Sequence, residues 1–438
     1  MLCQCNNADL FFNALNENVP VSIRLNPKKS KTGYDFKKVN WCSTGFYLDQ
    51  RPSFTHDPLF HAGTYFVQEA SSMFLEQFIL QTGMHEKPIT ALDLCASPGG
   101  KSTHLLSLLH PDSLLVSNEA IRSRIPALKE NIIKWGFPNV IITNNDPSVF
   151  SGHAGMFDLI VCDAPCSGEG MFRKDREAIN HWSEAHVKHC ADRQKRIVQQ
   201  AWKALKAGGI FIYSTCTYNK EENENVLQHL IDINVAVKSI PVNVSGMGDI
   251  DIQENPLTVY RFYPHLIIGE GFTIAGLTKS EKDDTDERTL VKMTQPKFKI
   301  SNHTAEWLNS DNGSFFEHNG KLHFLKDQVS RFIAEEGNKL NIVSAGTETA
   351  EIKGRVCIPL HESCMSILYR RKSFPEIELG RNDALNYLKG ETRFQIDASD
   401  GTFLFTCHNL PLGFARKTGN RFNNHYPKAW RIRKGNGS

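Results

Sequence analysis

Two cysteines stand directly after short apolar runs, at positions where a thiol could act on a substrate. Cys166 lies in the segment 163–168, after the apolar run 157–163, and Cys216 lies in the segment 214–217, at the end of the run 209–216. Carbon 5 of a pyrimidine is by itself a poor nucleophile. A thiolate that adds to carbon 6 converts carbon 5 into an enamine-like nucleophile. A second thiol could assist release of this adduct, and Asp163 could hydrogen-bond to the ring. Cys166, Cys216 and Asp163 are therefore candidate catalytic residues.

Free cysteines also have simpler explanations. Most of them are small buried hydrophobic residues, and this is how we interpret Cys95, Cys162 and Cys190. The spacing of Cys162 and Cys166 could hold zinc, but no second pair in the sequence has ligand spacing. We therefore predict that there is no metal site.

A glycine-rich turn follows the apolar run 89–95 and leads into a predicted helix. Glycines let the backbone approach a bound nucleoside closely, and a helix N-terminus offers free amides. A nucleotide, a dinucleotide or S-adenosylmethionine would fit, but the spacing is not that of a phosphate-binding P-loop. Glu119 and Asp146 end the next two predicted strands. Glu119 could accept the ribose hydroxyls and Asp146 could meet an adenine amino group, so the pair favours an adenosine ligand.

Between residues 89 and 279, apolar runs alternate with amphipathic stretches. The runs predict strands over 89–95, 114–119, 140–146, 157–163 and 209–216, and a late strand over 269–277. The stretches predict helices over 102–109, 121–135, 192–206 and 221–233. Strands separated by helical crossovers indicate an α/β fold with a parallel, doubly wound, Rossmann-like sheet, in which ligands bind beyond the carboxyl ends of the strands.

The chain of 438 residues is long enough for several domains. We predict an N-terminal RNA-contacting domain at 1–75, a catalytic domain at 76–279, a charged linker at 280–292, an α+β accessory domain at 293–374 and a small domain at 375–438. The sequence has no apolar run long enough to span a membrane. Its 11 cysteines are an odd number scattered along the chain, which is typical of the reducing cytoplasm rather than of a disulfide framework.

The formal net charge is only +2, so a basic surface has to be local. The last 28 residues contain no acid and seven cations, namely Arg416, Lys417, Arg421, Lys428, Arg431, Arg433 and Lys434. Phe414, Phe422, Tyr426 and Trp430 interleave with them. Cations that hold phosphates and aromatic rings that stack on bases predict RNA binding, although a solvated domain edge would have a similar composition. A lysine-rich turn at Lys28, Lys29 and Lys31 fits RNA contact and a solvated turn equally well.

These segments together resemble the Sun-type family of RNA cytosine-5 methyltransferases. Segment 93–102 is similar to the family's S-adenosylmethionine loop, 163–168 to its Asp-Ala-Pro-Cys-Ser-Gly motif and 214–217 to its Ser-Thr-Cys-Thr motif. Segment 170–175 resembles the bacterial RsmF-type branch, which acts on small-subunit ribosomal RNA. The resemblance also includes segments 68–73 and, more faintly, 424–428.

The resemblance implies an enzyme that forms 5-methylcytosine from S-adenosylmethionine. It implies Cys216 as the nucleophile and Cys166 as the residue that helps to release the product, whereas DNA cytosine-5 methyltransferases use the Pro-Cys thiol. The chemistry of the residues alone leaves both assignments open. The cofactor-binding residues that it implies are Cys95, Ala96, Ser97, Pro98, Gly99, Gly100, Lys101, Glu119, Asp146 and Asp163. Ser97 stands where the family more often has alanine. The resemblance further implies a PUA-like RNA-binding domain at 375–438.

We expect the partner to be RNA, namely ribosomal RNA or a ribosomal subunit, and we expect the chain to act as a monomer. Transfer RNA is the alternative substrate. A non-catalytic RNA-binding assembly factor would have a broken site, yet both thiols and both acidic residues are present. A small-molecule methyltransferase would not need two thiols and a basic tail.

Overall fold

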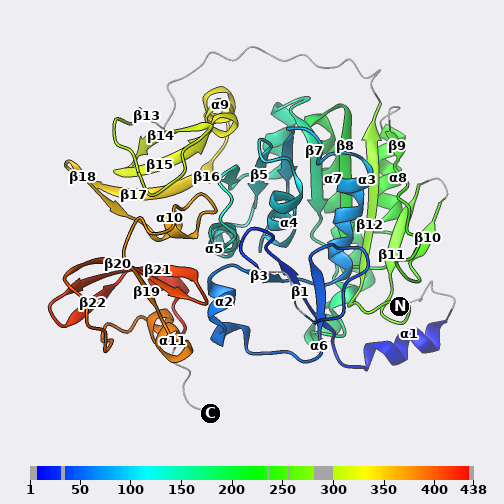
Figure 1. The fold of residues 1–438 in the computed structure, drawn as a ribbon. Helices are drawn as coiled ribbons and strands as arrows, with labels where there is room; N and C mark the ends of the chain where they lie inside the picture. The colour runs from blue at the N-terminus through cyan, green and yellow to red at the C-terminus, as the bar shows by residue number, and fades with distance from the viewer. Residues whose placement is uncertain (1–6, 31–34, 234–236, 255–256, 281–298, 434–438) are drawn as a thin grey trace.

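The computed structural model describes residues 7–30, 35–233, 237–254, 257–280 and 299–433. Lys31, Lys434 and residues 281–292 of the predicted linker lie outside the described residues. Among the described strands, ten form a central sheet, and smaller sheets contain three, five and four strands. In Figure 1 the three-stranded sheet lies below the central sheet, and the other two small sheets lie at its left side. The central sheet is therefore flanked by small sheets from both ends of the chain.

Five parallel strands form the middle of the central sheet, in the order β8-β7-β4-β5-β6. They are β4 (Thr90–Asp93), β5 (Leu114–Asn118), β6 (Val140–Thr143), β7 (Phe157–Asp163) and β8 (Leu205–Thr215). The chain proceeds from β4 towards one edge and returns through β7 towards the other. Strand order thus reverses between β4 and β7, and ligands of such sheets bind at this switch point. The predicted Rossmann-like fold is confirmed.

The edges of this sheet are antiparallel, so the prediction of a parallel sheet holds only for its middle. β12 (Phe272–Lys279) pairs with β8, and β11 (Val259–Phe262), β10 (Asp251–Gln253) and β9 (Val237–Ser239) extend this side. At the other edge β16 (Ile342–Ala345) pairs antiparallel with β6. The connection 263–271 between β11 and β12 is too short for the helical crossover that parallel strands require.

Helices cover both faces of the central sheet. On one face, α7 (Glu184–Ala204) and α8 (Glu224–Ile233) bury Trp202 and Leu230. On the other face, α3 (Leu75–Gln81), α4 (Gly100–Leu108) and α5 (Ile125–Trp135) bury Phe78 and Leu105. The short α6 (Arg176–His181) precedes α7. Within the described part of the chain, no helix is long and apolar enough to cross a membrane.

The N-terminal unit packs against α4 and α5. It contains β1 (Val21–Leu25), β2 (Gly45–Leu48), α2 (Pro58–His61), β3 (Tyr65–Val67) and α1 (Ala8–Leu15), which packs instead through Phe11 on Tyr218 and Tyr263. The fully buried Arg24 donates to the Gly100 carbonyl at 3.2 Å and to Thr103 Oγ1 at 2.6 Å. Lys29 Nζ donates to the carbonyls of Ala62 and Lys134 at 3.2 and 2.5 Å. Lys29 therefore serves packing, whereas Lys28 is exposed.

Two sheets follow in the C-terminal part. The first contains β13 (Lys299–Ile300), β14 (Gly313–His318), β15 (Lys321–Lys326), β17 (Thr347–Lys353) and β18 (Val356–Pro359), with α9 (Asp327–Glu336) and α10 (His361–Met365). The second contains β19 (Glu376–Glu378), β20 (Gly401–Cys407), β21 (Leu410–Thr418) and β22 (Arg421–Asn424), with α11 (Arg381–Lys389). Between α9 and β17 the chain passes through β16, which is an edge strand of the central sheet. The first of these two sheets is therefore joined directly to the central sheet.

The predicted stacking of tail aromatics on RNA bases is wrong for three of the four rings. Phe414, Phe422 and Tyr426 are at most 1% exposed. The alternation of side chains along β21 and β22 turns the two phenylalanines into the domain core. Only Trp430 is partly exposed. The cations meet the prediction better, because Arg416, Arg421, Lys428 and Arg433 are exposed.

Candidate active site

The glycine-rich turn between β4 and α4 lines a cavity of about 290 Å³ at the carboxyl end of the sheet. Gly99, the N-cap of α4, has a φ of 110°, a left-handed conformation that favours glycine. The predicted cofactor residues that line the cavity are Cys95, Ala96, Ser97, Pro98, Gly100, Lys101 and Asp163. The wall also includes the segment 66–69 of the N-terminal unit, residues 270–272 before and in β12, and Gly170, Met171 and Lys174 after β7.

Asp163 is held at the end of β7 by two partners. Lys101 Nζ lies 2.7 Å from Asp163 Oδ2, and Ser214 Oγ donates to Oδ1 at 2.8 Å. The side chain of Asp163 is still 39% exposed. The carboxylate is therefore fixed in direction and open to a ligand in the cavity.

Asp93, at the end of β4, was not among the predicted site residues. It is fully buried, and its Oδ2 accepts a hydrogen bond from Ser102 Oγ at 2.6 Å. Burial raises the pKa of Asp93 to about 7. Its partner Ser102 lies in the first turn of α4, so this contact fixes the helix and the glycine-rich turn to β4.

Glu119 and Asp146 lie past the ends of the neighbouring strands β5 and β6, and neither lines the cavity. Glu119 is buried. Its Oε1 accepts from Ile121 N at 2.8 Å, and its Oε2 has no hydrogen-bond partner among the described residues. Asp146 does not end a strand as predicted, because β6 stops at Thr143. It is exposed and caps the following helical turn through Ser148, and these hydrogen bonds lower the pKa of Asp146.

The structure brings the two predicted thiols into contact. Cys166 Sγ and Cys216 Sγ lie 3.1 Å apart, although 50 residues separate them in the chain. Both residues are partly buried, and Cys216 lines the cavity beside the glycine-rich turn. The hydrogen bond to Cys216, together with burial, raises the pKa of the Cys166 thiol well above its ordinary value. Cys166 is therefore a protonated thiol beside the sulfur of Cys216.

Two buried glutamates next to these thiols escaped prediction. Glu169 is 3% exposed and Glu222 is fully buried. Each accepts hydrogen bonds from the loop that carries the opposite thiol. In the sequence Glu222 stands in a charged stretch that resembles any solvated helix start, so only its position after the Cys216 motif could have suggested a role.

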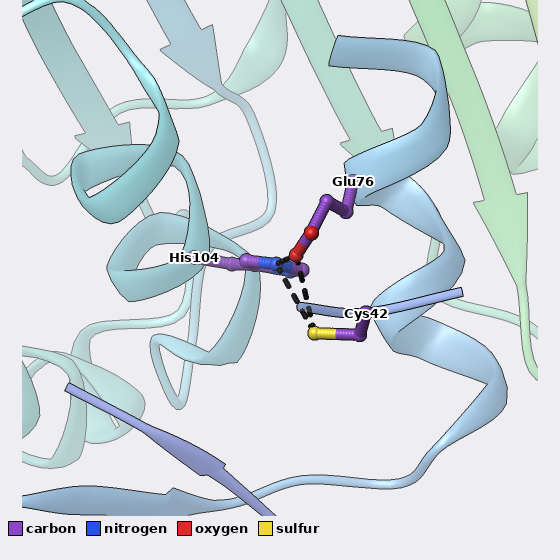
Figure 2. Close-up of side chains that lie close together, drawn as sticks. All are labelled: Cys42, Glu76 and His104. Carbon is purple, nitrogen blue, oxygen red and sulfur yellow. Dashed lines mark hydrogen bonds and ion pairs between the residues drawn. The ribbon is translucent and has the colours of Figure 1, made fainter. Parts of the chain in front are cut away.

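A second cluster of reactive side chains joins the N-terminal unit to α3 and α4. Figure 2 shows Cys42, Glu76 and His104 pointing toward one another. Glu76 Oε2 accepts from the Cys42 thiol at 3.2 Å and lies 3.0 Å from His104 Nε2. These three residue types could hold a zinc ion. However, the buried Arg24 already supplies positive charge, and Ser43 N satisfies Glu76 Oε1 at 2.8 Å. The cluster therefore forms a hydrogen-bonded link between the units, although His104 Nδ1 has no hydrogen-bond partner among the described residues.

A parallel sheet with a glycine-rich turn after its first strand, and acidic residues after the next two strands, is the nucleoside-binding arrangement of the Rossmann-like methyltransferases. Comparison with known proteins agrees with this class. Residues 79–278 match the 16S rRNA methyltransferase RsmB/F family model, 2–70 match the N-terminal domain of 16S rRNA methyltransferase RsmF, and 374–432 match the methyltransferase RsmF PUA domain.

Relatives extend over nearly the whole chain. Ribosomal RNA small subunit methyltransferase F of Aliivibrio fischeri is 30% identical over 426 residues, which cover 92% of this chain and 87% of that protein. The protein of the same name from Shewanella loihica is 29% identical over 434 residues, covering 93% and 88%. The chain belongs to the RsmB/F family of 16S rRNA methyltransferases, within its RsmF branch.

Solved structures share the catalytic fold. A methyltransferase homolog protein from Pyrococcus horikoshii is 28% identical, with a TM-score of 0.53 over 63% of this chain and 91% of that chain. NSun6 from Pyrococcus horikoshii, solved with SFG, is 20% identical and has a TM-score of 0.52 over 63% and 95%. The protein is thus an S-adenosylmethionine-dependent RNA methyltransferase with a C-terminal PUA domain, as the sequence predicted.

Proposed function

We propose that this enzyme forms 5-methylcytosine in small-subunit ribosomal RNA through a covalent adduct between Cys216 and the cytosine. The observation that carries the proposal is the contact of 3.1 Å between the two thiol sulfurs, of which Cys216 lines the cavity beside the glycine-rich turn. Methyl transfer to nitrogen or oxygen needs no such pair, whereas carbon 5 needs a nucleophile at carbon 6.

We propose that S-adenosylmethionine, the methyl donor, is held by residues 95–101, Glu119, Asp146 and Asp163. Three observations support this fit. Gly99 has the left-handed backbone that lets the turn bend round a ligand, Glu119 Oε2 is a buried oxygen without a hydrogen-bond partner among the described residues, and Asp163 is open to the cavity. Ser97 is compatible with this role, because its hydroxyl donates to the Arg124 carbonyl at 3.0 Å rather than into the cavity.

In the proposed reaction the Cys216 thiolate adds to carbon 6, and carbon 5 then takes the methyl group. The Asp163 carboxylate, held by Lys101 and Ser214, accepts a hydrogen bond from the exocyclic amine and orients the base. Release requires loss of the proton at carbon 5 and cleavage of the bond from carbon 6 to sulfur. The Cys166 thiol gives its proton to the departing sulfur, and the resulting thiolate takes the proton from carbon 5.

One denaturing gel with labelled substrate RNA tests these roles. Cys216→Ala should transfer no methyl group and form no adduct. Cys166→Ala should still attack and methylate but should release slowly, so a covalent protein–RNA complex accumulates. Cys357→Ala, a partly buried cysteine of β18, is the matched control and should behave like the wild type.

Other outcomes identify other functions. A stable adduct from Cys216→Ala would assign the nucleophile to Cys166, as in the DNA enzymes. If neither variant traps RNA and the wild type transfers no methyl group, the protein is a non-catalytic assembly factor. Bisulfite mapping of RNA from a deletion strain would distinguish ribosomal RNA from transfer RNA, the alternative substrate.

We further propose that the enzyme acts as a monomer in the cytoplasm and recognises ribosomal RNA or a ribosomal subunit. The domain division proposed from the sequence is 1–75, 76–279, the linker 280–292, 293–374 and 375–438. The matched ranges 2–70, 79–278 and 374–432 lie close to these boundaries and support the division. The exposed Arg416 and Arg421 of the PUA domain support a contact with phosphates there.

A further inference from the structure

Glu169 and Glu222 bridge the two loops that carry the candidate catalytic thiols. The Cys166 loop follows β7 and the Cys216 loop follows β8, and the glutamates lie three and six residues beyond their respective cysteines. Neither lines the cavity beside the glycine-rich turn. Because burying a carboxylate is costly unless it is hydrogen-bonded, the partners of these side chains indicate what they hold in place.

Glu222 comes from the Cys216 loop and accepts hydrogen bonds from the other loop. Ser167, the residue after Cys166, donates its backbone N–H to Glu222 Oε2 at 2.9 Å and its hydroxyl to Oε1. Gln194 Nε2 of α7 donates to Oε2 at 2.9 Å, and Asn219 Nδ2 donates to Oε1 at 2.8 Å. All four donors converge on one carboxylate, so its two oxygens connect both loops and α7.

Glu169 provides the reciprocal contact. It comes from the Cys166 loop, and its Oε2 accepts the backbone N–H groups of Tyr218 and Asn219 at 2.9 and 3.1 Å. A third link runs between the backbones, because Gly170 N donates to the Cys216 carbonyl at 2.9 Å. Each loop thus supplies one carboxylate that binds the backbone of the other.

We infer that Glu222 and Glu169 are positioning residues that hold the Cys166 and Cys216 sulfurs 3.1 Å apart. Two loops at the ends of different strands have no covalent connection that would fix this distance. Paired carboxylates with several donors each restrict the loops in more directions than a single hydrogen bond would. The negative charge of Glu222 also contributes, after the contact with Cys216 and burial, to the raised pKa of Cys166.

Disulfide formation measures the distance between the thiols without any methyl transfer. Diamide takes the two thiol hydrogens with two electrons, so the two S–H bonds are replaced by one S–S bond and the reagent becomes a hydrazine. Remaining thiols are alkylated at intervals, and peptide mass spectrometry follows the peptide pair joined through Cys166 and Cys216. The inference deepens the proposed methyl transfer and rests on it only for the catalytic measurement.

The test compares Glu222→Gln and Glu169→Gln with Glu221→Gln, an exposed glutamate next to Glu222. In each glutamine variant an amide NH2 group, which is a donor, replaces a carboxylate oxygen that accepts hydrogen bonds, so donor faces donor. We expect disulfide formation to slow about tenfold or more and kcat for RNA methylation to fall on the order of 100-fold, because small misplacements of reacting groups are that costly. The KM for RNA and the affinity for S-adenosylmethionine should remain those of the wild type, as should all properties of Glu221→Gln.

Ser167→Ala keeps the Glu222 carboxylate and removes only the hydroxyl donor, so the rates of disulfide formation and of methylation should both fall less than in the glutamine variants. This variant still tests the inference if a glutamine variant is unstable. Equal disulfide rates in Glu222→Gln, Glu169→Gln and Glu221→Gln would overturn the inference. So would the absence of the Cys166–Cys216 disulfide from oxidised wild type. If the disulfide rates follow the expected order but no variant or wild type methylates cytosine, the positioning role stands and the proposed function fails.

Discussion

Replacing Glu119 by glutamine should weaken S-adenosylmethionine binding more than a change at Asp146, the other acidic residue that follows a strand at the proposed cofactor site. Glu119 is 3% exposed. Its Oε1 is occupied by Ile121 N at 2.8 Å, and its Oε2 lies 3.6 Å from Arg124 Nη1 without a hydrogen bond among the described residues. Glutamine keeps the acceptor for Ile121 but replaces Oε2 by an uncharged amide donor, so a ribose hydroxyl loses its charged partner.

The magnitude follows from the kind of hydrogen bond that is lost. A hydrogen bond to a buried charged group contributes about 1.5–3 kcal/mol, which corresponds to roughly a 10- to 160-fold increase in Kd. Asp146 is exposed, and its Oδ1 already accepts two hydrogen bonds from Ser148. Asp146→Ala should therefore lose only about 0.5–1.5 kcal/mol, or roughly 2- to 10-fold in Kd.

Titration calorimetry with S-adenosylmethionine measures both variants, and their unfolding temperatures verify that they are folded. Asp112→Asn is the matched control, because Asp112 precedes β5 at the strand end opposite to Glu119. It should bind with wild-type affinity. If Glu119→Gln binds as tightly as this control, the ribose does not lie at the end of β5 and the proposed cofactor geometry is wrong.

Exposed cations of the β21–β22 hairpin in the PUA domain and the buried His104 provide two further tests. Arg416→Gln combined with Arg421→Gln should weaken RNA binding and reduce the slope of log K against log salt by about 1.5, because each lost phosphate contact removes about 0.7–0.9. The control is the double variant Lys87→Gln and Lys203→Gln, whose lysines precede β4 and β8, and it should leave the slope unchanged. An unchanged slope in the double arginine variant would contradict a phosphate contact. Burial, and then Arg24, lower the pKa of His104 from 6.5 to about 4, so folding stability is lost as the pH falls from 6.5 towards 4. At pH 5 this loss is about 2 kcal/mol. In chemical denaturation, the free energy of unfolding of His104→Gln should therefore change less between pH 7.5 and pH 5 than that of the wild type. The same pH dependence in both proteins would mean that His104 is accessible to protons.

The sequence predicted the elements whose signal is local. The apolar run 157–163 coincides with β7, and the glycine-rich turn precedes α4 as expected. Helix α7 was predicted to begin at residue 192 but begins at Glu184, where Ser183 caps it by accepting from His186 N. Val187, Cys190 and Ala191 continue the buried face in its first two turns, but these side chains are small, so the apolar period that predicted the rest of the helix is weak there.

The remaining differences depend on partners distant in the sequence. The tail aromatics have the composition of a nucleic-acid surface, but strand alternation and the other strands of the sheet bury Phe414 and Phe422. Antiparallel pairing of β16 with β6 joins segments about 200 residues apart, which no local pattern could indicate. Glu169 and Glu222 have ordinary local environments in the sequence, and their burial follows only from the contact between two loops.

The two halves of the proposed site are stabilised by different parts of the molecule. The cofactor half depends on the N-terminal unit, since the buried Arg24 binds Gly100 and Thr103 at the start of α4 and Gln68 Oε1 accepts from Arg24 Nε at 2.8 Å. The thiol half depends on contacts between the loops after β7 and β8. Because Asp163 ends β7 and pairs with Lys101 of α4, it joins the halves, so its orientation reports on both. A substitution in the N-terminal unit or in the loop contacts should therefore change the reaction by moving Asp163 relative to the two thiols. The substituted residue itself need not contact the RNA.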